Sequence, residues 1–375
     1  MKNKEADRKD RRRLNLPERI LIAVLSVILA LFLAVVINHL IRTSSEMSLL
    51  KANGYYNPVS VGDYSLNVAK FGKEDGKHTI VALAGLGMGD YSVLERKMTE
   101  SLEENNLVVY IDRAGYGLSD DSNKKMTIEN IVEDYRTALK NAGIKGPYIL
   151  LPHSLGGAYT TYWVSKYPEE IEAVVFLDGT QLSEGLSFGA GGDGDVSFMD
   201  KAQTFMLKLG LGRFVIQGYH YPYSDMFTED EQKMGDALRY MSLDSYSTGS
   251  EAALITANVR EAWSSIVTND VPKLYICASW GFQTEEELTT YNKWYNAQTV
   301  SRNLARPLRY ESYDHDPEYV KNLMQQYEDA RNTRLYPYCE KMGNCKVVLM
   351  PGDHNIFEQY PKELGHVIKD FIDKL

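Results

Sequence analysis

The sequence has few of the residues that mark several protein classes. It contains three cysteines among 375 residues, and only two of them lie close together, which is too few for a structural zinc site. The formal net charge is −10, so the chain has no electrostatic footprint for nucleic acid. No segment of roughly 20 to 50 residues repeats, which argues against a solenoid or propeller. The remainder, 44% apolar and 25% charged, is an ordinary globular composition.

One long apolar run stands near the N-terminus. Residues 20–41, ILIAVLSVILALFLAVVINHLI, contain no ionisable side chain except His39. At about 1.5 Å per residue, such a helix spans roughly 30 Å, the hydrocarbon thickness of a bilayer. A cleaved signal peptide usually has a shorter apolar stretch and a small-residue cleavage site, and a core helix usually has a polar face. The run therefore predicts an uncleaved transmembrane anchor.

The charge on either side of this run predicts its orientation. Residues 1–19 carry eight basic and four acidic side chains, a net +4, and the rest of the chain is strongly acidic. Positively charged flanks stay on the cytoplasmic side. We therefore expect residues 1–19 to be a basic cytoplasmic tail, 42–60 a linker, and the remaining chain to lie outside the cell membrane as the domain of a single-pass protein.

The cysteines fit that location. Cys277 lies in an apolar run and is expected to be a buried structural thiol. Cys339 and Cys345 are close in sequence, with Gly343 between them, and an extracellular domain can keep a disulfide there. The alternative is two free thiols.

Strand and helix patterns alternate along residues 61–375. Continuous apolar runs are typical of strands that are covered on both faces, and their alternation with helices predicts right-handed crossovers and a parallel sheet. The expected fold class is α/β, a mostly parallel twisted sheet with helices on both faces. The expected strands are 64–71, 78–85, 107–112, 148–154, 173–179, 273–279 and 345–352, and the expected helices include 91–104, 128–139, 155–165 and 361–372.

Two insertions interrupt this alternation, at about 181–270 and about 281–344. Both have helical patterns rich in tyrosine and methionine. They follow the ends of strands, so we expect them above the C-terminal edge of the sheet, where open α/β sheets bind ligands. The first insertion is predicted to be a cap or lid.

The strongest chemical signal is Ser154. The apolar strand ending in Pro152 and His153 leads directly into Ser154, and a helix starts at once after Leu155. This arrangement predicts a strained turn that holds the hydroxyl above the sheet, with the amide of Leu155 facing a developing oxyanion. Because a serine alone is a weak nucleophile, it requires a positioned base.

This stretch resembles the nucleophile elbow of the α/β-hydrolase superfamily, G-H-S-x-G-G, with Pro152 in place of the first glycine. Residues 84–89, AGLGMG, resemble the H-G-x-G oxyanion loop of that superfamily, and the match implies Leu86 as the second oxyanion donor. Residues 112–120, DRAGYGLSD, resemble its D-x-R-G-x-G-x-S-D signature, with Arg113 one place early. Residues 349–354, LMPGDH, resemble the segment that carries the catalytic histidine, which implies His354 as general base.

The acid of the implied triad has two candidates. The usual position follows the strand at 273–279, but no carboxylate appears there before Glu285, Glu286 and Glu287. The alternative is Asp178 at the tip of the preceding strand, where some lipases of the superfamily carry their acid. The acid must orient and stabilise an imidazolium, for which a fixed strand tip is better suited than a run of glutamates. We expect Asp178.

The expected activity is that of a serine hydrolase that cleaves a carboxylic ester with a hydrophobic part, such as a lipid, through an acyl-enzyme. No metal or organic cofactor is required. A serine nucleophile argues against epoxide and haloalkane hydrolysis, for which the superfamily uses aspartate. A peptidase or amidase on the same scaffold, or a membrane-tethered binding protein without activity, remains an alternative. The expected partners are the membrane, through residues 20–41, and a small-molecule or lipid ester.

Overall fold

The computed structural model describes residues 15–189, 191–217, 226–243, 245–301 and 317–375. Within these residues one eight-stranded sheet has the order β1-β2-β4-β3-β5-β6-β7-β8. The strands are β1 Pro58–Ser60, β2 Ser65–Gly72, β3 Thr79–Leu83, β4 Leu107–Ile111, β5 Tyr148–Pro152, β6 Ile171–Leu177, β7 Lys273–Cys277 and β8 Cys345–Leu349.

The sheet is mostly parallel. β1 and β2 pair antiparallel, as do β2 and β4, whereas all other neighbours are parallel. Every residue of β4, β5 and β7 is buried, which is why their sequences are continuous apolar runs instead of alternating ones. The expected fold class is confirmed.

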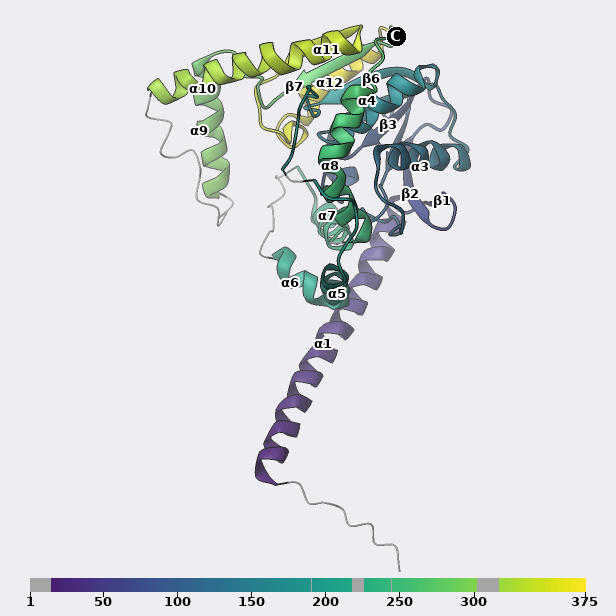
Figure 1. Cartoon of the computed structure of the whole chain (residues 1–375), viewed down its shortest axis with the longest axis vertical. Coiled ribbons are helices and arrows are strands. Elements are labelled where there is room, and N and C mark those ends of the chain that lie inside the picture. Colours follow the sequence, from purple (N-terminus) through teal and green to yellow (C-terminus); the bar gives the residue numbers. More distant parts are fainter. Residues whose placement is uncertain (1–14, 190, 218–225, 244, 302–316) are drawn as a thin grey trace, which may run out of the picture.

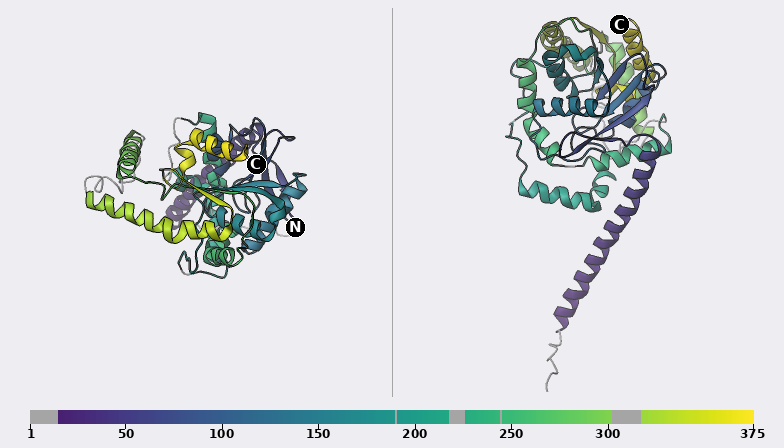
Figure 2. Two further views of the ribbon diagram at one scale, coloured as in Figure 1. Left: turned by 90° about the horizontal axis from the view of Figure 1, so that it is seen from above. Right: turned by 90° about the vertical axis from the view of Figure 1, so that its right-hand side faces the viewer.

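Helices cover both faces of the sheet (Figure 2). On one face, α2 (Tyr91–Thr99) and α12 (Pro361–Ile372) pack together over one apolar cluster. On the other, α3 (Ile128–Asn141), α4 (Gly156–Lys166) and α8 (Tyr246–Ser264) pack over a second cluster. The parallel strands therefore end at a common edge, framed by helices on both sides.

The two expected insertions occupy the chain between the last strands. Between β6 and β7 lie α5 (Phe198–Met206), the π-helical turn η2 (Leu207–Leu211), α6 (Gly212–Gln217), α7 (Glu229–Met241) and α8. Between β7 and β8 lie α9 (Glu285–Ser301), α10 (Pro317–Ala330), η3 (Arg331–Leu335) and α11 (Tyr336–Met342). We call the segment α5–η2–α6 the lid.

The N-terminal helix α1 runs from Leu16 to Ala52 over 37 residues and extends away from the sheet (Figure 1). Asn15 caps its first turn. Its most apolar window has a mean hydropathy of 3.4 and contains no buried residue, so α1 has the length and composition to cross a membrane. Most of the predicted basic tail, residues 1–14, lies outside the described residues.

The residues predicted to form a linker, 42–60, are largely regular structure, because α1 continues to Ala52 and Pro58–Ser60 form β1. Leu50 is completely buried in the sheet's apolar cluster, and Glu46 pairs with Arg213. These contacts with distant parts of the chain hold a polar segment in the helix, and sequence pattern alone does not reveal them.

All three cysteines are free thiols, so the disulfide expected between Cys339 and Cys345 is not present. Cys339 lies on α11 and Cys345 begins β8. A hydrogen bond with Cys345, together with burial, raises the pKa of the Cys339 thiol well above its ordinary value. Cys277 is buried in β7, as expected.

Candidate active site

Ser154 sits on a sharp turn between β5 and α4. Its φ is 52°, in the left-handed region that few non-glycine residues adopt. Its carbonyl accepts hydrogen bonds from the amides of Gly157 and Thr180, both at 2.9 Å. A Cβ on Gly156 would lie 2.6 Å from the carbonyl oxygen of Leu83, so the glycine allows the close approach of helix and strand. The turn has the geometry expected of a nucleophile elbow.

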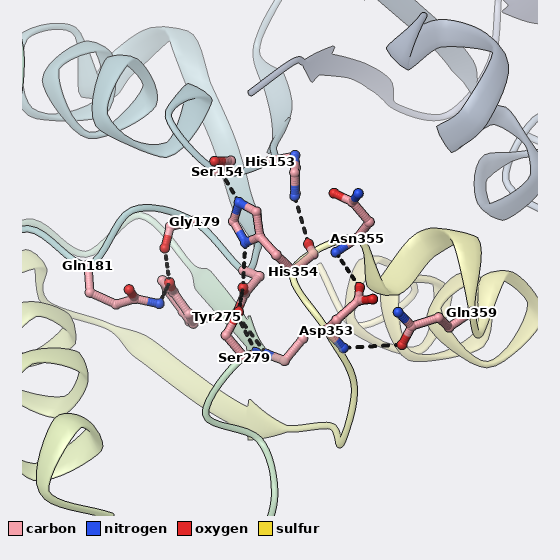
Figure 3. A network of polar contacts seen from close by, with 12 residues as sticks. His153, Ser154, Gly179, Gln181, Tyr275, Ser279, Asp353, His354, Asn355 and Gln359 are labelled. Carbon is pink, nitrogen blue, oxygen red and sulfur yellow. Dashed lines mark hydrogen bonds and ion pairs between the residues drawn. The ribbon is translucent and has the colours of Figure 1, made fainter. Parts of the chain in front are cut away.

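His354 follows β8 and meets Ser154 at the common strand edge (Figure 3). Its Nε2 lies 2.8 Å from Ser154 Oγ, and its Nδ1 lies 2.7 Å from Asp178 Oδ2. The structure therefore brings the three residues expected from sequence into one hydrogen-bonded chain, in the order serine, histidine, aspartate. The side chain of His354 is 50% exposed, whereas that of Asp178 is 2% exposed.

Asp178 is fixed by contacts that the sequence did not reveal. It follows β6 with a φ of 41°. Its Oδ1 accepts hydrogen bonds from the amides of Ala278 at 2.8 Å and Ser279 at 3.1 Å, and the Ser279 hydroxyl donates to Oδ2. Ser279 follows β7, where the superfamily usually has its acid, so here that position orients a carboxylate from the neighbouring strand. The pairing of β6 with β7 is the signal that could have pointed to it.

The charge states of Asp178 and His354 suit a general base that is stabilised by a neighbouring anion. Burial alone would raise the pKa of Asp178, but the hydrogen bond to His354, the histidine's charge and the hydrogen bonds from Ser279 and Ala278 together lower the pKa below its ordinary value. Burial also lowers the pKa of His354, yet the hydrogen bond and the charge of Asp178 raise it overall. Asp178 is therefore ionised at neutral pH and favours a proton on the imidazole.

The rival carboxylates lie elsewhere. Glu285, Glu286 and Glu287 open α9, where an acidic first turn is favoured by the helix dipole. Glu287 accepts hydrogen bonds from the amides of Gln283 and Thr284, and Glu285 and Glu286 are exposed. His354 is hydrogen-bonded to Asp178 instead.

His153, the neighbour of Ser154, contacts the backbone of the base. Its Nε2 lies 2.8 Å from the carbonyl oxygen of His354 (Figure 3). Its ring stacks on Tyr91 with centroids 5.9 Å apart. Burial lowers the pKa of His153 to about 3, so it is neutral and its Nε2–H donates to that carbonyl. The two histidines of the insertions, His220 and His315, lie outside the described residues.

The loop expected to form the oxyanion hole lies against Ser154. A Cβ on Gly85 would lie 2.8 Å from Ser154 Cβ and 3.3 Å from its Oγ, so only glycine fits there. The next residue, Leu86, and Leu155 after the serine carry the two amides that sequence assigns to the oxyanion. Within the described residues, neither amide donates a hydrogen bond.

Arg113 anchors the loop at residues 84–89. Its guanidinium donates to the carbonyl oxygens of Ala84 and Gly85, the latter at 2.7 Å, and is almost completely buried. Its Nε lies 3.1 Å from Glu251 of α8, which is also completely buried. The hydroxyl of Tyr116 accepts a hydrogen bond from the amide of Gly87 at 3.1 Å. The motif at 112–120 therefore supports the loop at 84–89.

No group of three or more histidine, cysteine, aspartate or glutamate side chains is placed to hold a metal in the described part of the chain. The groups at the strand edge are a hydroxyl, an imidazole and a carboxylate with backbone amides nearby, a set that is able to perform nucleophilic acyl transfer.

Comparison with known proteins bears on the fold that carries these residues. The model of the alpha/beta hydrolase fold family matches residues 79–219, which include the elbow, the loop at 84–89 and Asp178. The chain therefore has the α/β-hydrolase fold. Among solved structures, a probable hydrolytic enzyme from Pseudomonas aeruginosa is 13% identical, with a TM-score of 0.53 over 84% of this chain and 93% of that one.

Two further proteins are similar to this chain in sequence. The uncharacterized protein YbdG of Bacillus subtilis is 28% identical over 253 residues, which is 64% of this chain and 75% of that protein. A chloroplastic protein of Arabidopsis thaliana, provisionally assigned as methylesterase 12, is 31% identical over 147 residues, 38% of this chain and 39% of that protein.

Proposed function

We propose that this α/β-hydrolase is a membrane-anchored serine hydrolase that cleaves carboxylic esters with a hydrophobic part. The observation that carries the proposal is the hydrogen-bonded chain from Ser154 through His354 to Asp178, with the serine on a left-handed turn at a helix N-terminus. A binding protein without activity would have no use for a strained serine, a correctly directed imidazole and a buried carboxylate together.

The reaction would proceed in two acyl transfers. His354 Nε2 takes the proton of Ser154 while Oγ attacks the ester carbonyl, and the amides of Leu86 and Leu155 stabilise the oxyanion. His354 then donates the proton to the departing alkoxide, which leaves an acyl group on Ser154. Water, deprotonated by the same imidazole, releases the acid and restores the serine. Asp178 stays ionised throughout and stabilises the imidazolium.

The leaving group and chain length of the substrate can be tested directly. We expect p-nitrophenyl esters to give a burst of p-nitrophenol, with the acyl mass recovered on the peptide that contains Ser154. Esters with longer acyl chains should be better substrates than the acetyl ester, since each buried methylene contributes about 0.8 kcal/mol. Matching p-nitroanilides serve as the control. Faster cleavage of the anilides than of the esters would assign the site to a peptidase or amidase.

We further propose that α1 spans the cell membrane with the hydrolase domain outside. The support is the exposed apolar stretch of α1 and the net +4 of residues 1–19. Protease added to intact cells should therefore remove the domain and leave a short membrane-protected fragment. A mutant in which the basic residues of the tail become glutamine provides the control for orientation. A domain that resists protease until the cells are lysed would contradict the proposed topology.

A further inference from the structure

The lid binds the anchor helix through a buried polar contact. Arg213 of α6 forms a bidentate ion pair with Glu46 of α1, with both N–O distances at 2.8 Å. The same guanidinium donates to Thr43 Oγ1 at 2.9 Å and to His39 Nδ1 at 3.2 Å. Planar two-point pairing of this kind fixes orientation as well as distance. The lid therefore has a defined position along α1.

A close packing contact sets that position more exactly along the helix axis. Gly210 of η2 has a φ of 109°, and a Cβ on it would lie 2.8 Å from His39 Cβ and 3.3 Å from Val35 Cγ1. The apolar run of α1 ends at Ile41, six residues beyond Val35. At about 1.5 Å per residue, the contact of the lid with Val35 therefore lies about 9 Å inside the apolar run, measured from its end at Ile41. Helices that lie in a bilayer interface are buried by a similar depth, about 5–10 Å.

The lid also presents large apolar side chains outward. Phe198, Met199, Phe205, Met206 and Phe214 are 82%, 74%, 62%, 40% and 62% exposed. Apart from α1, they account for most of the strongly exposed aromatic and methionine side chains among the described residues. In Figure 1, α5 is seen end-on beside α1, which lies in the plane of the picture, so the lid crosses the anchor helix. Because α5 crosses α1, it lies along the membrane surface when α1 spans the bilayer.

We propose that the lid lies in the interface of the bilayer that holds α1, with Phe198, Phe205 and Phe214 among the acyl chains, so that the site receives its ester from the membrane. The proposal rests on the proposed serine hydrolase function for the substrate, but the docking of the lid does not depend on it. The occupant of the apolar surface is the lipid because the lid is fixed beside the only described helix that can span a membrane, at interfacial depth.

Quenching by lipid tests the docking without reference to activity. The full chain is reconstituted in phosphatidylcholine vesicles with brominated acyl chains, as Phe205→Trp, as Phe214→Trp, and as Tyr336→Trp on α11, which lies at the far side of the domain from α1 (Figure 1). We expect the emission that each lid tryptophan adds over the parent protein to be quenched severalfold, and that of the Tyr336→Trp control to be unchanged. Equal, unquenched emission at all three positions would overturn the proposal. A lid that is covered by a second copy of the chain would give this same result.

A second measurement tests delivery of the substrate. The variant Phe198→Ser/Phe205→Ser/Phe214→Ser should hydrolyse a long-chain ester dispersed in vesicles at least tenfold more slowly, while its rate on a water-soluble acetyl ester changes less than twofold. Equal loss on both esters would show that the lid serves the fold or the chemistry and not membrane delivery. If the proposed function itself is wrong, the wild-type chain hydrolyses neither ester, but the quenching result still decides where the lid lies.

Discussion

Replacement of Ser154 by alanine is expected to lower kcat for ester hydrolysis by roughly 10⁶, the scale seen when a serine hydrolase loses its nucleophile. The reason is geometric. The left-handed turn at Ser154 places Oγ 2.8 Å from the base, and no other hydroxyl is hydrogen-bonded to His354 in the described residues. A fluorophosphonate probe should label the wild-type protein at Ser154 and leave Ser154→Ala unlabelled.

The control is Ser165→Ala, which removes a buried hydroxyl from the same helix, α4. This variant should keep both labelling and activity. Circular dichroism of all three proteins shows whether they are folded. Equal labelling of wild type and Ser154→Ala would remove Ser154 from the mechanism.

The change Asp178→Asn should lower kcat by roughly 10⁴, because the imidazole loses the anion that orients and stabilises it. The contacts of Asp178 with Ala278 and Ser279 predict that the asparagine keeps its place but not its charge. The matched variant is Glu285→Gln/Glu286→Gln/Glu287→Gln, which should cost less than about tenfold, the scale of a peripheral electrostatic effect. The reverse ranking in folded proteins would move the acid to α9.

The variant Asp178→Asn should also change the pH dependence of kcat/KM. The base must be neutral to accept the serine proton, so kcat/KM falls as pH falls through the pKa of His354. Partial burial lowers this pKa, but Asp178 raises it above its ordinary value of 6.5. The wild-type acid limb should therefore lie above pH 6.5, and in Asp178→Asn the residual activity should persist to lower pH. An acid limb that stays in place would show that Asp178 does not set the basicity of His354.

The parallel strands of the fold were predictable because burial on both faces leaves a continuous apolar sequence. Those runs and the helices between them appear at the expected positions, from β3 at Thr79–Leu83 to β8 at Cys345–Leu349. β1 was not predictable, since it has three residues, none of them buried. The helical continuation of α1 past residue 41 was also missed, because Leu50 and Glu46 are held by partners far along the chain.

The candidate site was predictable where a motif fixes backbone shape. A strand that leads directly into a serine and small residues specifies the turn at Ser154. The ends of parallel strands converge at one edge of the sheet, where Asp178 and His354 also lie. The contact of Ser279 with Asp178 required the pairing of β6 and β7, which no local pattern encodes. The catalytic roles of these residues, and those of the Leu86 and Leu155 amides, stay predictions until the variants are measured.

The ion pair between Arg113 and Glu251 limits how this architecture can be recombined. Arg113 belongs to the hydrolase core, whereas its counter-charge comes from α8 of the first insertion, and both side chains are almost completely buried. Removal of one partner of a buried pair typically costs about 3–5 kcal/mol, because the other charge is left uncompensated. The insertion is therefore not an exchangeable module. A graft that replaces it with a helix from another hydrolase must supply a carboxylate at the position of Glu251, or the loop that faces Ser154 loses its support.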